Sequence, residues 1–279
     1  MIFSRIIIFF LVFFITTETI AQKKLKFKPP RDFKKFKTNT ALLPSKELTS
    51  PTPAVILLPS CDGIRSKSIG QYKTWTKFFA ENGYVVLTVD HYKQRNAQGS
   101  GCTLDRKVTE VQLARDMYDA VEYLSGIENI DRNRIFSLGF SLGSLANALA
   151  ASKKMNERIG KGKLRPRAVG SLYGGCKFGY VARFLFTDTD IPLIWLMASE
   201  DVEVPPEDCI ETLQEIKKIN KVKIVWHIYD GVTHCWDCRN RHMDSFTSHV
   251  HGKRVIYKYN PEATKDSQQR VLKFFNSFK

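Results

Sequence analysis

An apolar strand that runs directly into a glycine-flanked serine is the feature that most constrains this chain. The stretch starts at Arg134 and leads into Gly139-Phe-Ser-Leu-Gly143, and a helix-like apolar segment follows from Ser144. A turn this tight pushes its central residue, Ser141, toward strained backbone angles, so the flanking positions need to be nearly free of side chains. The pattern predicts a G-x-S-x-G nucleophile elbow between a strand and a helix.

The rest of the chain alternates apolar runs of strand length with segments of helical periodicity. Such alternation predicts the α/β class, with a mostly parallel central sheet and helices on both of its faces. The expected strands, besides the one at the elbow, cover residues 53–58, 84–90, 168–173, 192–198 and 222–229. The expected helices cover residues 68–82, 108–124, 144–151, 205–219 and 262–278.

The N-terminus has the pattern of a secretory signal peptide. Arg5 precedes an apolar run over residues 6–15, and small residues at Thr19 and Ala21 offer a cleavage site before Gln22. The run is short for a transmembrane helix, and an uncleaved signal anchor is the alternative. We therefore expect a signal peptide at 1–21, a basic arm at 22–52, a single α/β domain at 53–279, and export to the periplasm or the medium.

The net charge of +15 is unusual, and the lysines and arginines concentrate in residues 23–37 and 153–167. A solvated basic surface is the simplest interpretation. Weak contact with an anionic membrane or polysaccharide is the alternative. No sequence signature of a nucleic-acid-binding fold accompanies the charge, so we expect no nucleic-acid partner. We also expect no obligate protein partner.

A serine nucleophile needs a base and an acid, which in this fold follow in the order acid, then histidine. Asp201 comes after the strand ending at Ala198 and is the predicted acid, with Glu200 and Glu203 as alternatives. His234 lies in the loop after the last predicted strand and is the predicted base. The remaining histidines are less well placed in the chain: His91, His227, His242, His249 and His251.

These residue types fit acyl transfer. The imidazole takes the serine proton and returns it to the leaving group, while the carboxylate fixes the imidazole tautomer. The backbone N–H groups of Leu142 and Cys61 are the predicted oxyanion donors, because one opens the elbow helix and the other follows the first buried strand. The aromatic residues Phe140, Tyr173 and Trp236 are candidates for the substrate pocket, with core packing as the alternative.

Residues 53–278 resemble the dienelactone hydrolase family of α/β-hydrolases. The matching pieces are Ala54-Val-Ile-Leu-Leu-Pro-Ser-Cys-Asp-Gly63, the run from Trp75 to Asp90, Gly139-Phe-Ser-Leu-Gly143, Ala198-Ser-Glu-Asp201 and Tyr229-Asp-Gly-Val-Thr-His234. The resemblance implies the fold and assigns the nucleophile to Ser141, the acid to Asp201 and the base to His234. The founding members carry cysteine at the elbow where this chain has serine, so we expect a general ester instead of dienelactone. Many relatives have His-Gly or His-Glu where this chain has Pro59-Ser60, and this departure concerns the shape of the oxyanion loop.

Six cysteines in an exported protein suggest disulfides. Cys235 and Cys238 form a C-x-x-C beside His234, which we interpret as a clamp on the histidine loop, with Cys209 as a candidate partner. Half of a zinc site and a redox motif are the alternatives. Cys61 and Cys102 are a second candidate pair.

The sequence predicts a serine hydrolase that cleaves a carboxylic ester or lactone through an acyl-enzyme, with no cofactor and no metal. Two alternatives stay open. The same triad also suits peptide, amide or thioester cleavage, and the fold also occurs in binding proteins without catalysis.

Overall fold

The computed structural model describes residues 24–25, 39–42, 51–64, 67–95, 97, 108–176, 188–248 and 252–278. The predicted signal peptide, most of the basic arm, Cys102, His249 and His251 lie outside these residues. Among the helices that are described, none is both long and apolar enough to cross a membrane.

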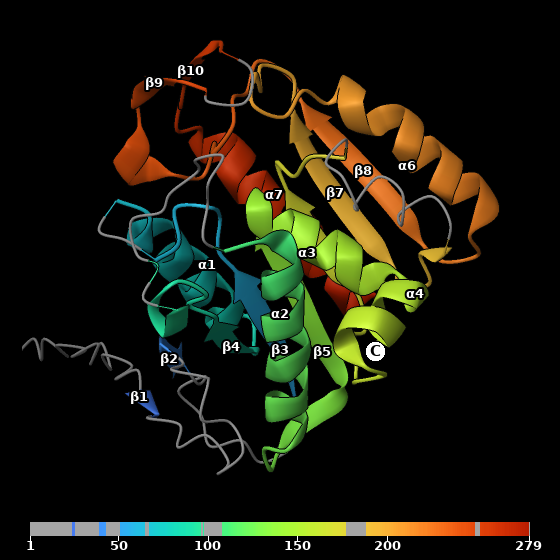
Figure 1. Ribbon diagram of the computed structural model, residues 1–279. Coiled ribbons are helices and arrows are strands. Elements are labelled where there is room, and N and C mark those ends of the chain that lie inside the picture. Colours follow the sequence, from blue (N-terminus) through green and yellow to red (C-terminus); the bar gives the residue numbers. More distant parts are fainter. Residues whose placement is uncertain are drawn as a thin grey trace, which may run out of the picture.

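A mostly parallel sheet forms the centre of the protein (Figure 1). In the described ranges the strand order is β1-β2-β4-β3-β5-β6-β7-β8. The six neighbouring strands β4, β3, β5, β6, β7 and β8 run parallel. Strands β2 and β1 extend the sheet beyond β4 in antiparallel pairing. The bounds are β1 (Lys24–Leu25), β2 (Asn39–Leu42), β3 (Thr52–Leu58), β4 (Val85–Thr88), β5 (Ile130–Phe140), β6 (Val169–Leu172), β7 (Leu193–Ala198) and β8 (Ile224–Tyr229).

Helices cover both faces of this sheet. In Figure 1, α2 and α3 lie in front of the sheet and α7 lies behind it. The side chains of α2, α3 and α6 share one buried apolar cluster, and those of α1 and α7 share another. The bounds are α1 (Ile69–Glu81), α2 (Glu110–Ser125), α3 (Leu142–Ala151), α4 (Lys153–Met155), α6 (Glu207–Ile219) and α7 (Pro261–Asn276). The predicted α/β-hydrolase fold is confirmed.

Local sequence explains where α2 and α7 begin. At the start of α2, the Thr109 side chain accepts a hydrogen bond from the backbone N–H of Gln112, and the Gln112 side chain accepts one from the Thr109 N–H. This reciprocal capping satisfies backbone donors that the helix itself leaves without partners. At α7, Asn260 caps the N–H of Ala263, and Pro261 occupies the first turn, where no N–H is required.

Two short regions have more regular structure than the sequence pattern predicted. Within the basic stretch 153–167, α4 continues into a π-helix over Asn156–Gly160. Part of its charge is paired, because Lys163 contacts Asp119 and Arg165 contacts Asp190. Near the C-terminus, β9 (Ser245–Thr247) and β10 (Arg254–Ile256) form an antiparallel hairpin.

The register of the sheet brings the functional loops together. Leu58 pairs with Gly139 across β3 and β5, so the loop after β3 starts beside the elbow. Ala198 pairs with Tyr229 across β7 and β8, so the loops that carry Asp201 and His234 leave the sheet at the same level. Ligands of parallel α/β sheets bind at this carboxyl edge.

Candidate active site

Ser141 occupies a strained turn between β5 and α3. Its φ of 50° and ψ of −110° lie in a region of backbone conformation that residues other than glycine rarely adopt. The turn is held in place because the Ser141 N–H donates to the Leu172 carbonyl at 3.0 Å, and the Ser144 N–H donates to the Ser141 carbonyl at 2.9 Å. Strain of this kind persists where the surrounding structure imposes it, and it often marks functional sites.

The two glycines of the elbow are required by close backbone approach. A Cβ atom on Gly139 would overlap the backbone of Gly143 and Ser144. A Cβ atom on Gly143 would overlap the carbonyl oxygen of Leu58 and stand 2.9 Å from that of Pro59. The start of α3 therefore packs directly on the loop that follows β3.

We expect Gly143→Ala to lower kcat/KM of the ester hydrolysis proposed below by at least about 100-fold. The added Cβ would displace the loop after β3 and move the predicted oxyanion donor Cys61 away from the oxyanion. Steady-state kinetics measures this effect. Gly126→Ala is the matched control, since the nearest atom to its added Cβ would be 3.6 Å away at the end of α2. Equal rates for the two variants would contradict the close packing of α3 on the loop.

His234 and Asp201 form a buried pair. The His234 Nδ1 lies 2.7 Å from Asp201 Oδ2. The other oxygen of Asp201 accepts hydrogen bonds from the backbone N–H groups of Glu203 at 3.0 Å and Val204 at 2.9 Å. With its proton on Nδ1, the neutral imidazole presents Nε2 as the basic atom, which is the tautomer that a general base toward serine needs.

Contacts along neighbouring strands connect this pair to the elbow. Ser141 bonds to Leu172 of β6, and the ring of the next residue, Tyr173, lies 4.6 Å from the His234 ring between centroids. Tyr173 and Cys235 share with Ser141 a positive φ, of 40° and 58° respectively. Three strained residues thus lie in the three loops that follow β5, β6 and β8.

The surroundings of His234 favour its protonated form. Burial lowers its pKa, but the charges of Asp201 and Glu203 and the hydrogen bond to Asp201 outweigh burial and the nearby Arg241, and they raise the pKa to about 9. A base must be neutral to accept the serine proton. Hydrolysis is therefore expected to increase as the pH rises toward this value.

One predicted oxyanion donor lies at the start of α3 and the other lies in the loop that follows β3. Leu142 opens α3, where the N–H groups of a helix point toward its N-terminus. In the loop after β3, the Ser60 N–H donates to the Tyr72 hydroxyl at 3.0 Å, so it is already engaged, and Cys61 is the next residue. Cys61 is disulfide-bonded, and its predicted partner Cys102 lies outside the described residues.

The three aromatic candidates for the substrate pocket are all buried. Phe140 packs edge-on against Tyr72 and Trp75 in the core. Trp236 lies edge-on to Tyr173. Tyr173 directly follows β6, the strand that pairs with β5, and its ring contacts the ring of His234.

The disulfides differ from the predicted clamp. Cys209 pairs with Cys176, so its predicted link to the C-x-x-C motif is wrong. Cys235 and Cys238 pair with each other and close a loop directly after His234. Zinc binding requires thiolates, which these bonded sulfurs do not present. His242, one of the remaining histidines, accepts a hydrogen bond from the Tyr259 N–H.

Two carboxylates near His234 have roles that the sequence did not indicate. Asp237 is fully buried and accepts hydrogen bonds from the side chains of Gln71, Trp75 and Tyr173. Glu203, considered only as an alternative acid, lies on the opposite edge of the imidazole from Asp201, with Oε2 3.8 Å from Nε2. The other alternative, Glu200, is exposed and pairs with Lys258.

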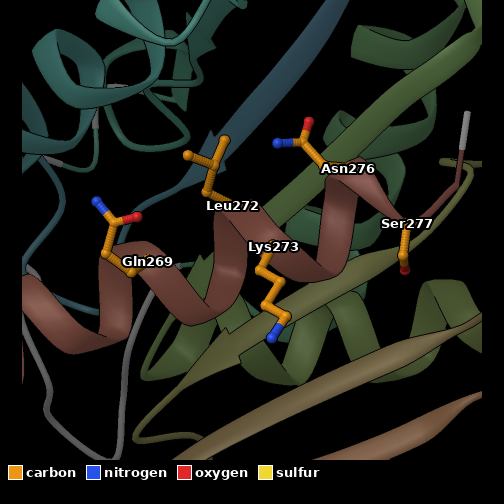
Figure 2. Close-up of a pocket in the computed structure, with 5 residues that line it drawn as sticks. All are labelled: Gln269, Leu272, Lys273, Asn276 and Ser277. Atoms are coloured by element: carbon orange, nitrogen blue, oxygen red, sulfur yellow. The ribbon is translucent and has the colours of Figure 1, made fainter.

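A hollow of about 470 Å³ lies along the last helix, α7. Figure 2 shows the residues that line it: Gln269, Leu272, Lys273, Asn276 and Ser277. All of them belong to the C-terminal part of the chain, and none comes from the elbow or from the loops of Asp201 and His234. We do not assign the hollow to the active site.

The sheet order, the elbow and the buried His–Asp pair define the protein as an α/β-hydrolase. The sequence pattern of the dienelactone hydrolase family matches residues 39–279, and the chain belongs to this family of hydrolases. No curated protein matches the sequence significantly.

Solved structures with the same fold include hydrolases of low sequence identity. A putative dienelactone hydrolase from Klebsiella pneumoniae superposes with a TM-score of 0.65 at 17% identity, covering 86% of this chain and 94% of the other. Esterase 2 of Thermogutta terrifontis, phosphorylated by paraoxon, gives 0.60 at 11% identity, covering 90% and 97%. A dienelactone hydrolase-like promiscuous phosphotriesterase from metagenomic libraries gives 0.57 at 15% identity, covering 86% and 91%.

Proposed function

We propose that the protein is a serine hydrolase that cleaves carboxylic esters or lactones through an acyl-enzyme. The observation that carries the proposal is the buried hydrogen bond of 2.7 Å between His234 and Asp201, in two loops that leave the same edge of the sheet as the strained Ser141. Membership of the dienelactone hydrolase family and the esterase among the structural neighbours support it.

In the proposed reaction, Ser141 Oγ attacks the ester carbonyl carbon while His234 Nε2 takes the hydroxyl proton. The resulting oxyanion accepts hydrogen bonds from the N–H groups of Leu142 and Cys61. The C–O bond of the ester then breaks, and His234 returns the proton to the departing alcohol. Water repeats the sequence on the acyl-enzyme and releases the carboxylic acid, while Asp201 stabilises the imidazolium in both halves.

We also propose that the protein is exported and works outside the cytoplasm. The signal-peptide pattern at residues 1–21 is the first support. The disulfides Cys176–Cys209 and Cys235–Cys238 are the second, because such bonds persist mainly in oxidising compartments.

A panel of chromogenic substrates with one acyl group, linked as an ester, a thioester or an anilide, tests the function. We expect a higher kcat/KM for the ester than for the anilide, since an alkoxide leaves more easily than an amine and the proposed mechanism includes no contact specific to an amide. A preference for the thioester or the anilide would move the assignment to that bond on the same triad. No turnover of any substrate would contradict hydrolysis and favour a binding role.

A further inference from the structure

A second carboxylate stands at the edge of His234 that faces away from Asp201. Glu203 Oε2 lies 3.8 Å from His234 Nε2, the atom to which the proposed mechanism assigns the serine proton. The same Glu203 oxygen accepts a hydrogen bond of 2.7 Å from the Tyr257 hydroxyl. The Tyr257 ring stacks on the imidazole, with 5.7 Å between centroids and 28° between planes. His234 is therefore contacted by carboxylates at both of its nitrogens.

The position of Glu203 is fixed by the chain around it. Its backbone N–H is bonded to Asp201 Oδ1, so the acid of the pair also orients the segment that carries the second carboxylate. Tyr257, which follows β10, is buried and holds the carboxylate end. The backbone bond to Asp201 and the hydrogen bond from Tyr257 together hold Glu203 beside the imidazole.

Arg241 completes the charged surroundings. Its guanidinium lies over the Tyr257 ring at 4.5 Å from the centroid, and it pairs with Asp62, which directly follows the predicted oxyanion donor Cys61. In the described part of the chain, the groups that face His234 are thus Asp201 and Glu203 from one loop, Tyr173 after β6, Tyr257 after β10, and Arg241 at a greater distance. The negative charges of Asp201 and Glu203 favour the protonated imidazole, and the positive charge of Arg241 disfavours it.

We propose that Glu203 is a positioning residue of the hydrolase: held by Tyr257, it binds the protonated Nε2 edge of His234, competes there with Ser141, and moves the working range of the enzyme to alkaline pH. This inference rests on the proposed ester hydrolysis. It assigns to Glu203 no contact with substrate. The residue acts through the imidazole, by stabilising the form of His234 that cannot accept a proton.

The direction of the effect follows from charge. A carboxylate within about 4–6 Å of an imidazole stabilises the protonated imidazole and typically raises its pKa by about 1 to 3. At a pH below the pKa, the neutral fraction of a histidine falls about tenfold when the pKa rises by one. Glu203→Gln keeps the size of the side chain and removes its charge, so the midpoint of the His234 titration is expected to fall by at least about one pH unit.

The test is the pH dependence of kcat/KM between about pH 5 and 10, measured with the ester that the panel identifies. Glu203→Gln is expected to be at least about tenfold faster than the wild type at about pH 6 and to reach its plateau at lower pH. Glu200→Gln is the matched control, because Glu200 lies in the same loop, is paired with Lys258 and does not contact His234. Its profile is expected to overlay that of the wild type.

A merely structural role for Glu203 predicts something else. The variant would then lose the same factor at every pH, and its profile would keep the wild-type midpoint, which would overturn the proposal. An equal shift in Glu200→Gln would also overturn it, because the effect would then belong to the overall charge of the protein.

A second readout separates this inference from the proposed function. The His234 imidazole signal can be followed by NMR during a pH titration, with His234→Asn to assign it, and this measurement needs no turnover. A midpoint that moves down in Glu203→Gln, in a protein that hydrolyses no ester, would support the contact and reject the function. Turnover with an unchanged His234 midpoint would reject the inference alone.

Discussion

Ser141→Ala is expected to lower kcat/KM for the preferred ester by about 10⁴-fold or more. The alanine has no hydroxyl to attack the carbonyl carbon, and the pair of His234 and Asp201 then has no proton to move. The remaining rate would come from the oxyanion donors and from binding alone. Initial-rate kinetics at the pH optimum measures the effect.

The substitution removes one oxygen atom from a half-buried residue, so the fold should tolerate it. The backbone bonds that hold the elbow, from the Ser141 N–H to Leu172 and from the Ser144 N–H to Ser141, remain available to alanine. We expect the thermal unfolding midpoint to change by no more than a few degrees. A well-folded variant that kept most of the activity would show that another residue is the nucleophile.

Asp237→Ala is expected to lower the free energy of unfolding by at least about 3 kcal/mol. The carboxylate is fully buried and accepts hydrogen bonds from Gln71 Nε2 at 3.0 Å, Trp75 Nε1 at 2.7 Å and the Tyr173 hydroxyl at 2.9 Å. Without it, these buried donors lose a shared acceptor, and each one costs about 1–3 kcal/mol when it stays unsatisfied. Urea denaturation, read as midpoint and slope, measures the change.

Asp230→Ala is the matched control for this experiment. Asp230 belongs to the same loop as His234 but is exposed, and its carboxylate accepts a hydrogen bond of 3.3 Å from the Ser199 hydroxyl. A substitution there is expected to change stability by about 0.5 kcal/mol or less. If Asp237→Ala were no more destabilising than this control, the buried network would not hold α1 to the histidine loop as the hydrogen bonds indicate.

The central sheet could be predicted because its strands carry a simple signal. Strands buried on both faces appear as unbroken apolar runs, and β3 and β7 match the expected residues to within one position. The short strands β9 and β10 have no such signal. They are three residues each, which is too short for alternation or an apolar run to mark them as strands.

Some residues of the candidate site could likewise be predicted from the sequence, and others could not. Ser141, Asp201 and His234 could be proposed because each follows a recognisable strand in a fixed order along the chain. Asp237 could not, because its donors Gln71 and Trp75 lie far away in the sequence, on helix α1. The contact of Glu203 with His234 depends on Tyr257, a residue of a hairpin region that the sequence did not reveal.

Covalent labelling tests most directly whether Ser141 is an activated nucleophile. A fluorophosphonate forms a bond from phosphorus to an activated serine oxygen and releases fluoride, and peptide mass mapping then locates the adduct. We expect one equivalent of adduct on the peptide that contains Ser141 and none on that peptide in Ser141→Ala. An adduct on a different residue, or an unlabelled wild-type protein that is folded, would contradict the assignment of Ser141 as the nucleophile.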